Sequence, residues 1–355
     1  MKILTLISAL GIGGAQQMVY ELIKNIDNKE FDMTVLSYGG KSNNALESRM
    51  EQVCSVKYLE YAGHIGLQKI IKVMKCMTSF HPDIIHVHMG GVAFAIPWGL
   101  IHHKPVIVTV HTKPENAFSQ KNEKLVRYGI KKGAVVLVAV SEENYKKVRE
   151  YFNIIDDNQC LYINNGVDVN RFYREKHDGF AFINVATQDE NKNQSILLKA
   201  FKKIHMLHPN TKLYLIGDGP CHSQLIELRH ELKLDDVVDI PGSIGNPEVY
   251  YAKADVYVQT SHREAMPLSI LEAISAGLPI ISTDVGGIKD VVDTNGYLVN
   301  DNDEDALYNA MKNVLECSSV ELKQMEARSS EIADCYSSKK MAQKYCQLYR
   351  QCISK

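Results

Sequence analysis

The most informative stretch of the sequence is Ser261-His262-Arg263-Glu264-Ala265-Met266-Pro267-Leu268-Ser269-Ile270-Leu271-Glu272-Ala273-Ile274-Ser275-Ala276-Gly277. It carries two glutamates, Glu264 and Glu272, eight residues apart. Proline has no N–H to lose at the first position of a helix, so we predict that a helix begins at Pro267. Glu264 then lies in the loop and Glu272 in the second turn. Free N–H groups at the helix start would form a seat for a diphosphate, with carboxylates on both sides to accept hydrogen bonds from hydroxyls.

The flanks of this stretch predict a complete βαβ unit. A strand-like run, Ala254–Thr260, leads into it, and Gly277–Gly287 reads as a helix stop, a buried strand and a glycine turn. Buried apolar runs alternate with helical segments along the rest of the chain, which predicts two doubly wound α/β domains. We expect strands at 2–7, 33–37, 83–88, 106–111 and 135–140 in the first domain, and at 182–186, 212–216, 237–240, 255–259 and 279–282 in the second.

Length and charge limit the class of protein. A chain of 355 residues with 45% hydrophobic content is long enough to bury two cores. Its formal net charge is −2. Residues 1–170 hold 19 basic and 16 acidic residues, which leaves 21 basic and 26 acidic residues for the rest. This asymmetry is too small for a nucleic-acid-binding protein, so we expect no nucleic acid as a partner.

The sequence favours a cytoplasmic protein. No hydrophobic run approaches the roughly 20 residues that span a bilayer, and residues 1–8 are too short for a signal peptide. Residues 66–77 place Lys69, Lys72 and Lys75 beside an apolar stripe. Such a helix could dock peripherally on the anionic inner face of the membrane, but more often it covers a core.

The turn after the first expected strand is rich in glycine. Its pattern, Gly11-x-Gly13-x-x-Gln16, has a glutamine where a dinucleotide fingerprint needs a third small residue. A dehydrogenase is therefore disfavoured. Gly13 and Gly14 would instead let a phosphate or an acceptor approach the backbone at a helix start. A tight turn without a ligand is the alternative.

Five ordered motifs resemble the retaining glycosyltransferases of the GT-B fold, and specifically glycosyltransferase family 4. Besides the paired glutamates, the chain carries sequences similar to the family's GGA loop, its interdomain NGVD motif, its GDGP turn, and its G and AD-V signatures. These are Gly11–Ala15, Asn164–Asp168 followed by Arg171-Phe172, Ile216–Pro220, Pro241-Gly242-Ser243 and Ala254-Asp255-Val256. The resemblance covers nearly the whole chain.

The resemblance implies two Rossmann-like domains facing across a cleft. Residues 1–165 would form an acceptor-binding domain, 166–178 a linker, and 179–355 a nucleotide-sugar-binding domain whose last helix, at about 340–352, crosses back to the first domain. The implied activity is metal-independent transfer of a sugar, with retention, from a nucleotide-diphosphate sugar to a hydroxyl of a glycan or lipid-linked acceptor. UDP is the commonest donor nucleotide in the family, and polysaccharide biosynthesis at the cell surface is the expected context. No cofactor is expected, since the nucleotide sugar is a co-substrate.

The resemblance also assigns residues to roles. Glu264, His111 and Lys192 would act on the reacting sugar and the diphosphate, and Gly13 and Gly14 would form the phosphate or acceptor loop. The expected donor-binding residues are Glu272, Thr187, Gly217, Gly219, Ser243, Met266, Pro267 and Leu268.

One position departs from the family pattern. Relatives commonly carry an arginine and a lysine in the loop after the first donor-domain strand, whereas this chain has Thr187 and Lys192. The loss of one cation could weaken stabilisation of the departing diphosphate, and Arg263 is a candidate substitute. Thr187 thus keeps open the alternative of a non-catalytic GT-B partner subunit. A second alternative is a nucleotide-sugar 2-epimerase, which needs no acceptor and which the paired glutamates disfavour.

Histidines offer a separate alternative. His86 and His88 share one face of an expected strand, a spacing that can bind metal, but no carboxylate or cysteine cluster accompanies them. We therefore predict no metal site.

Overall fold

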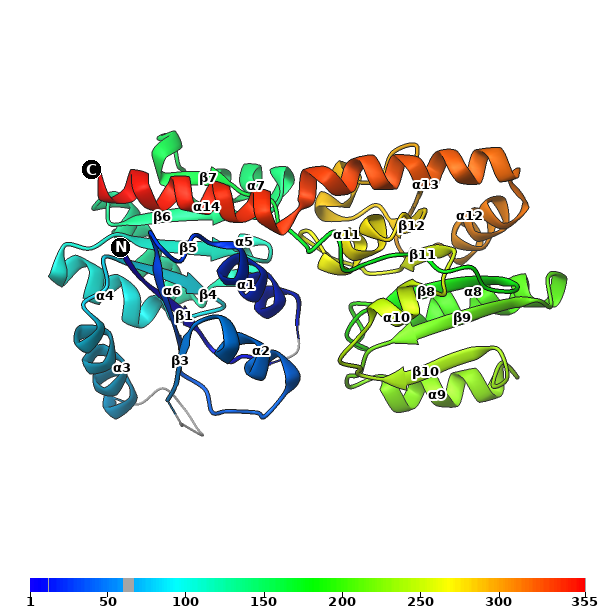
Figure 1. Ribbon diagram of the computed structural model, residues 1–355, viewed down its shortest axis with the longest axis horizontal. Helices are drawn as coiled ribbons and strands as arrows, with labels where there is room; N and C mark the ends of the chain where they lie inside the picture. Colours follow the sequence, from blue (N-terminus) through cyan, green and yellow to red (C-terminus); the bar gives the residue numbers. More distant parts are fainter. Residues whose placement is uncertain (12, 60–66, 355) are drawn as a thin grey trace. The chain divides into compact units, whose positions relative to one another are not determined.

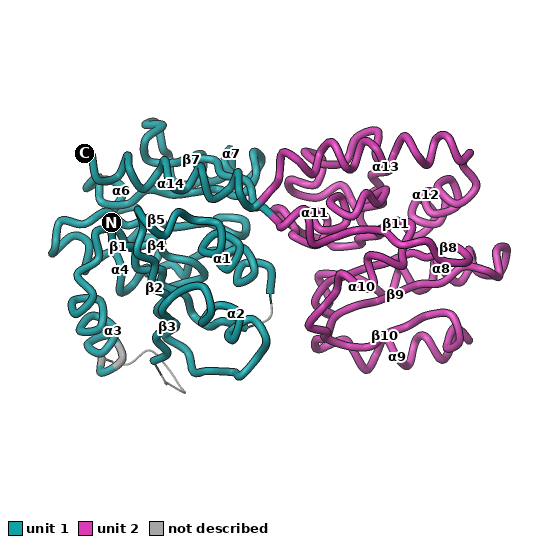
Figure 2. Tube along the Cα trace, in the orientation of Figure 1, with its two compact units in different colours: residues 1–166, 338–355 teal, residues 167–337 magenta. Residues whose placement is uncertain are grey.

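The computed structural model describes residues 1–11, 13–59 and 67–354, and it divides into two compact units (Figure 2). Unit 1 comprises Met1–Gly166 together with Ser338–Lys355, and unit 2 comprises Val167–Ser337. The segment predicted as a linker, 166–178, therefore falls almost entirely within unit 2. The predicted α/β architecture with two parallel sheets is confirmed.

Unit 1 is built on a seven-stranded parallel sheet with the order β3-β2-β1-β4-β5-β6-β7 (Figure 1). Its strands are β1 (Lys2–Ile7), β2 (Asp32–Ser37), β3 (Ser55–Tyr58), β4 (Ile84–His88), β5 (Val106–Val110), β6 (Val135–Ala139) and β7 (Cys160–Tyr162). Its helices are α1 (Gly14–Asn25), α2 (Ala45–Val53), α3 (Leu67–Phe80), α4 (Val92–His102), α5 (Pro114–Ala117), α6 (Gln120–Lys131), α7 (Glu142–Phe152), η1 (Asp157–Gln159) and α14 (Ser338–Ile353).

Alternation along the strands gives this sheet two different faces. Leu4 and Leu6 point into an apolar cluster that includes side chains of α3, α4 and α6. The opposite face mixes apolar side chains such as Ile3 and Ile7 with polar ones. It carries His86, which bonds through Nδ1 to the Tyr349 hydroxyl of α14 at 2.7 Å and through Nε2 to the Thr109 hydroxyl at 2.8 Å. The last helix of the chain is thus anchored on the sheet of unit 1 through buried hydrogen bonds.

The apolar stripe of the segment 66–77 serves the core. Val73 and Met77 of α3 are fully buried in the cluster, with Ile70 and Met74 packed against it, while Ile71 remains 45% exposed. Gly66 lies outside the described residues. The burial of Val73 and Met77 therefore favours the interpretation that this helix covers a core over the interpretation that it docks on a membrane.

Unit 2 has a six-stranded parallel sheet with the order β10-β9-β8-β11-β12-β13. Its strands are β8 (Phe180–Val185), β9 (Thr211–Ile216), β10 (Val238–Gly242), β11 (Val256–Gln259), β12 (Ile280–Thr283) and β13 (Gly296–Val299). Its helices are α8 (Gln194–Leu207), α9 (His222–Glu231), α10 (Glu248–Tyr251), α11 (Leu268–Ser275), η2 (Gly286–Asp290), α12 (Glu304–Glu316), α13 (Ser319–Ala333) and η3 (Asp334–Tyr336). One apolar core lies between this sheet and α8, α9 and α12.

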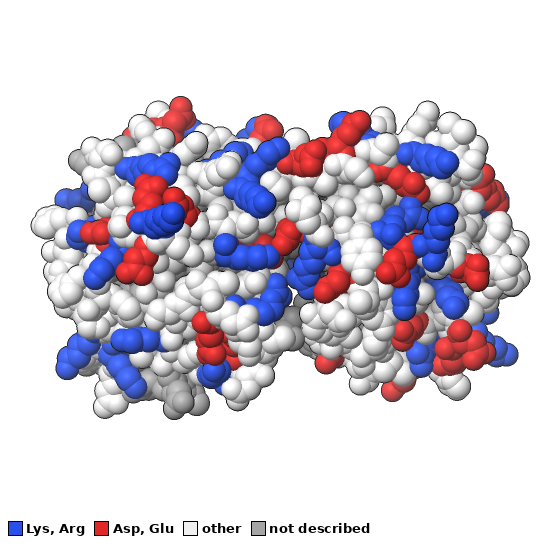
Figure 3. Space-filling view, in the orientation of Figure 1, with Lys and Arg blue, Asp and Glu red and all other residues white. Residues whose placement is uncertain are grey.

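Charge does not single out a surface on the face drawn in Figure 3, where acidic and basic side chains are interspersed over each unit. In the part of the chain that the structure describes, no helix is both long enough and apolar enough to cross a membrane.

The buried histidines of unit 1 should make its stability depend on pH. Burial lowers the pKa of His86 to about 3, with a smaller contribution from His111, and lowers the pKa of His88 well below its ordinary value. The groups that face His86 are neutral hydroxyls and imidazoles. Since the folded-state pKa lies below the unfolded value of about 6.5, the unfolded chain takes up the proton first as the pH falls.

We therefore expect full stability above about pH 6.5, and a loss of about 1.4 kcal/mol per pH unit for each such histidine below it. Urea unfolding at pH 7.5 and 5.5 measures this. His86→Gln should reduce the pH dependence, while His230→Gln, which changes a mostly exposed imidazole, should preserve it. An equal slope in wild type and His86→Gln would contradict the prediction.

Candidate functional site

The predicted donor-site residues of unit 2 all follow the carboxyl ends of strands. Thr187 and Lys192 lie in the loop after β8, Gly217 and Gly219 lie after β9, and Ser243 lies directly after β10. The loop after β11 carries Glu264, Met266 and Pro267, and α11 begins at Leu268 and contains Glu272. Parallel strands bring these loops to one edge of the sheet.

The helix after the Glu264 loop begins one residue later than predicted. Pro267 has an extended backbone (φ −72°, ψ 131°) and precedes the first helical residue, Leu268. The ring of proline restricts φ but leaves ψ free, so the residue fits this flanking position as well. Among the described residues, no side chain caps the helix start. Its first N–H groups therefore have no intrahelical or side-chain acceptor.

Lys192 and Glu264 are brought into direct contact. Lys192 Nζ lies 2.5 Å from Glu264 Oε1, and the two side chains are 20% and 11% exposed. Because both groups are largely shielded from water, this pair is screened less than an exposed ion pair. The amide of Gln259 donates to the same carboxylate oxygen at 2.8 Å.

Backbone contacts hold the two loops together. The His262 N–H donates to the Asn191 carbonyl at 2.8 Å, and the Thr260 hydroxyl donates to the Lys192 carbonyl at 2.8 Å. On the other side, the Gly287 N–H donates to the Ala265 carbonyl at 2.8 Å. These hydrogen bonds hold in place the backbone of the two loops that carry Lys192 and Glu264.

The GDGP turn packs directly on the loop after β8. Gly217 has φ +134°, and a Cβ built there would lie 1.9 Å from the Ala186 carbonyl oxygen. At Gly219 it would lie 2.4 Å from the Gln188 carbonyl oxygen. Only glycine permits this approach, so these two glycines shape the loop that carries Thr187 and Lys192.

Glu272 lies apart from the ion pair and has a tyrosine partner. The Tyr251 hydroxyl is 3.0 Å from Glu272 Oε2 and 3.1 Å from the Ser269 carbonyl oxygen. Tyr251 is fully buried, and this burial, together with the Glu272 charge, raises its pKa well above the ordinary value. The tyrosine therefore stays a hydroxyl donor that orients the glutamate.

The departure at Thr187 is visible in the structure. The Thr187 side chain is exposed, and its carbonyl accepts a hydrogen bond from the Gln194 amide at 3.1 Å. Arg263, the candidate substitute, is also exposed, and its Nε lies 3.4 Å from Asn191 Oδ1. Lys192 is thus the cation that contacts Glu264.

In unit 1, the predicted residues also follow carboxyl ends of strands. Gly13 flanks the start of α1, whose first residue is Gly14, and His111 directly follows β5. His111 Nε2 lies 3.0 Å from Nδ1 of His88, the last residue of β4. Burial lowers the pKa of His111 to about 4, so its ring is neutral near pH 7.

The histidines bear on the metal alternative. Both ring nitrogens of His86 are engaged by hydroxyls, and within the described ranges no group of three or more His, Cys, Asp or Glu residues could hold a metal ion. The acidic run at 301–305 leads into a helix, and the Asp303 side chain accepts from the Ala306 N–H at 2.9 Å at the start of α12.

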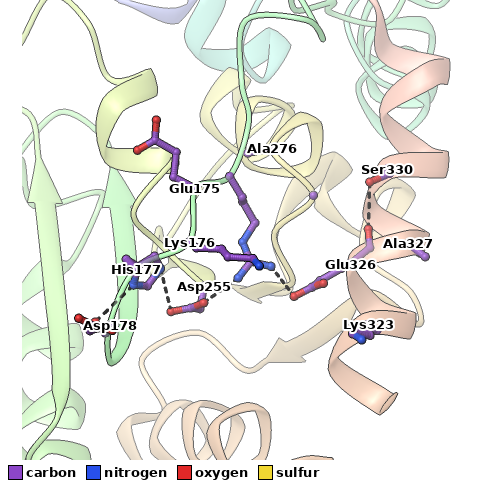
Figure 4. Close-up of a pocket in the computed structure, with 12 residues that line it drawn as sticks. Glu175, Lys176, His177, Asp178, Asp255, Ala276, Lys323, Glu326, Ala327 and Ser330 are labelled. Carbon is purple, nitrogen blue, oxygen red and sulfur yellow. Dashed lines mark hydrogen bonds and ion pairs between the residues drawn. The ribbon is translucent and has the colours of Figure 1, made fainter. Parts of the chain in front are cut away.

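A pocket in unit 2 lies at the amino end of β11, whereas the predicted donor-site residues lie at the carboxyl ends of the strands (Figure 4). Its wall includes Asp255, which directly precedes β11, and Glu326 and Ser330 of α13. Arg174 crosses it, with a 2.6 Å ion pair to Asp255 and a second ion pair to Glu326. Because Asp255 marks the amino end of the strand, this pocket is distinct from the predicted donor site.

Two family models together match most of the chain. The model described as Glycosyltransferase Family 4 matches residues 12–171, and the model described as Glycosyl transferases group 1 matches residues 169–332. The chain belongs to the GT-B glycosyltransferases. The predicted GT-B glycosyltransferase family is confirmed, and each half of the chain matches one of the two models.

Individual relatives share about a quarter of their residues with this chain. The chain is 27% identical over 242 residues to an uncharacterized glycosyltransferase of Methanocaldococcus jannaschii, a match that covers 61% of this chain and 59% of the relative. It is 25% identical over 335 residues, 85% of each chain, to the UDP-Gal:alpha-D-GlcNAc-diphosphoundecaprenol alpha-1,3-galactosyltransferase of Escherichia coli.

Solved structures support the fold. The crystal structure of Anabaena HepE in complex with UDP-glucose aligns with a TM-score of 0.84 at 19% identity, covering 98% of each chain. At this identity the likeness concerns the fold alone.

The sequence did not single out Gln259, Tyr257, Tyr251 or Ser269, which surround the two glutamates. A polar glutamine in an otherwise apolar buried strand, directly before the Glu264 loop, is the signal that could have indicated the first of them.

Proposed function

We propose that this protein transfers a sugar from a nucleotide-diphosphate sugar, with UDP as the nucleotide, to a hydroxyl of a glycan or lipid-linked acceptor, with retention at the anomeric carbon. The observation that carries the proposal is the Lys192–Glu264 pair beside the uncapped start of α11. The likeness to the E. coli transferase, whose name gives UDP-Gal as its donor, supports the choice of donor.

In the proposed reaction, the bond from the anomeric carbon to the diphosphate oxygen breaks and a bond to the acceptor oxygen forms. The acceptor proton passes to the departing phosphate, so no separate general base is required. Lys192 and the N–H groups at Leu268 stabilise the charge that develops on the diphosphate. These groups supply the positive charge that a divalent metal would otherwise contribute, and we propose metal-independent transfer on that basis.

The other predicted residues complete the proposed site. Glu272, oriented by Tyr251, would accept hydrogen bonds from the ribose hydroxyls, and Glu264 would do the same for the sugar hydroxyls. Thr187, Gly217, Gly219, Ser243, Met266 and Pro267 would line the nucleotide sugar, and His111 would contact the sugar as a neutral imidazole. Gly13 and Gly14 would form the phosphate or acceptor loop.

Thermal unfolding against nucleotides tests the donor site. Ligand at about one hundred times its dissociation constant adds about 2.7 kcal/mol of stability. We expect UDP and UDP-sugars to raise the unfolding temperature equally with and without a chelator, and Glu272→Ala to abolish the shift. Glu231→Ala, which removes an exposed carboxylate at the end of α9, is the control and should keep it.

The outcomes separate the alternatives. Product formation that requires an acceptor identifies a transferase, whereas conversion of the nucleotide sugar without an acceptor identifies a 2-epimerase. No shift with any nucleotide and no product would favour the non-catalytic partner, which the exposed Thr187 supports.

Peripheral contact with the inner face of the membrane, in the cytoplasm and in the context of cell-surface polysaccharide biosynthesis, is a further part of the proposal. Its support is the diphosphoundecaprenol acceptor in the name of the E. coli relative. Helix α3 gives less support, because most of its apolar stripe packs in the core. We expect the protein to sediment with vesicles that contain anionic lipid, and not with neutral vesicles. Equal recovery in both supernatants would refute membrane contact.

A further inference from the structure

Gln259 is a buried amide at the base of the Glu264 loop. It is the last residue of β11, and only 1% of its surface is exposed. Its Nε2 donates to Glu264 Oε1 at 2.8 Å and to the Ser261 hydroxyl at 3.1 Å, and its Oε1 accepts from the Tyr257 hydroxyl at 3.0 Å. Both ends of the amide are therefore engaged.

The chemistry of these neighbours fixes which way the amide points. An ionised carboxylate only accepts hydrogen bonds, so the NH2 end must face Glu264. The opposite end then presents its oxygen to the Tyr257 hydroxyl. Burial raises the pKa of Tyr257 far above neutrality, which keeps this hydroxyl protonated and able to donate. A flipped amide would set two oxygens against each other.

The contact leaves the two oxygens of Glu264 in different situations. Oε1 receives both Lys192 Nζ at 2.5 Å and Gln259 Nε2 at 2.8 Å. Two donors thus hold this oxygen. Glu264 Oε2 makes no hydrogen bond to a described residue, and this atom is not fully buried. Oε2 is the oxygen that remains for a substrate hydroxyl.

The same network reaches the second glutamate. The Tyr257 hydroxyl lies 2.8 Å from the Ser269 hydroxyl in the first turn of α11. The Ser269 carbonyl oxygen lies 3.1 Å from the hydroxyl of Tyr251, which contacts Glu272 Oε2 at 3.0 Å. The rings of Tyr251 and Tyr257 are stacked, with centroids 6.2 Å apart. Both glutamates thus rest on one buried layer of side chains.

We propose that Gln259 is a positioning residue for the transfer reaction, which acts by holding the carboxylate of Glu264 so that Oε2 faces the sugar hydroxyls. This inference rests on the proposed function and adds a residue to it. Lys192 alone cannot fix the carboxylate, because its ammonium ion is a point charge on a flexible chain and would move toward a bound diphosphate. Gln259, which is buried, stays in place when the donor binds.

Gln259→Leu removes the donor and keeps similar volume. We expect kcat to fall about 10- to 100-fold, since small misplacements of a reacting geometry have effects of this size. The KM for the donor and the thermal shift with UDP alone should stay nearly unchanged. Asn295→Leu is the matched control, since it removes a fully buried amide whose hydrogen bonds lie with Asp293, Val291 and Ser329, and it should leave kcat unchanged.

A double-mutant cycle with Glu264→Ala tests whether Gln259 acts through Glu264. The transfer rate of the double variant should equal that of Glu264→Ala, and the urea-unfolding cycle of the same variants should also be non-additive. An unchanged kcat in Gln259→Leu, or additive losses, would overturn the proposal. If the wild-type protein transfers no sugar but the unfolding cycle is non-additive, the proposed function is refuted and the contact between Gln259 and Glu264 stands. If the unfolding cycle is additive, the contact itself is refuted.

Discussion

Glu264→Ala is expected to lower the rate of sugar transfer at least about 10²- to 10³-fold, the range for the loss of one preorganised polar group at a reacting centre. The physical reason is that this carboxylate is held by Lys192 and Gln259 with one oxygen left for substrate. Its removal also deprives a buried amide of its acceptor, at a cost of about 1–3 kcal/mol in stability.

Nucleotide binding distinguishes lost chemistry from lost folding. Without Glu264, the charge of Lys192 is no longer neutralised by an ion pair, so the affinity for UDP should be retained or increased. Transfer assays and thermal unfolding with UDP, run on wild type, Glu264→Ala and the Glu231→Ala control, measure both effects. Near-normal turnover in Glu264→Ala would show that this carboxylate is not part of the reaction.

The central strands of both sheets could be predicted because their residues form continuous apolar runs. All five residues of β6, for example, are apolar and four of them are buried, as is typical of parallel strands covered on both faces. The strands that the sequence did not reveal are β3, β7 and β13, each at the edge of its sheet. They are three or four residues long and partly exposed, so no apolar run marks them.

In the candidate site, too, the sequence reveals what local motifs encode and does not reveal contacts between residues that are distant in the chain. The loop positions of Glu264 and Lys192 followed from local motifs, and the structure brings the two side chains together across 72 positions of sequence. Tyr251, Tyr257 and Gln259 belong to a helix and a strand, where their residue types suggest packing alone. Only the pairing of β11 with its neighbours and the placement of α10 turn them into partners of the glutamates.

The glycine turn after β12 should prove as important for this site as the glutamates. Gly286 has φ +61°, and a Cβ built there would lie 2.0 Å from the carbonyl oxygen of Glu264. The neighbouring Gly287 N–H bonds to the Ala265 carbonyl at 2.8 Å. The two glycines therefore let the turn pack directly against the Glu264 loop. The backbone of the Glu264 loop cannot move aside without breaking its hydrogen bonds to the loop that carries Lys192.

Gly286→Ala is expected to destabilise unit 2 by about 2–4 kcal/mol, which combines the left-handed strain of about 1 kcal/mol with overpacking against backbone of about 1–3 kcal/mol. It should also lower transfer strongly, because the displaced loop carries Glu264. Gly277→Ala is the matched control: its φ is +74°, but the nearest atom to its Cβ would be the Ser330 hydroxyl at 3.3 Å. Urea unfolding and kcat measure the two effects. If Gly277→Ala and Gly286→Ala lose equal stability and keep equal activity, then backbone strain alone is responsible, and the close approach of the glycine turn does not hold the Glu264 loop in place.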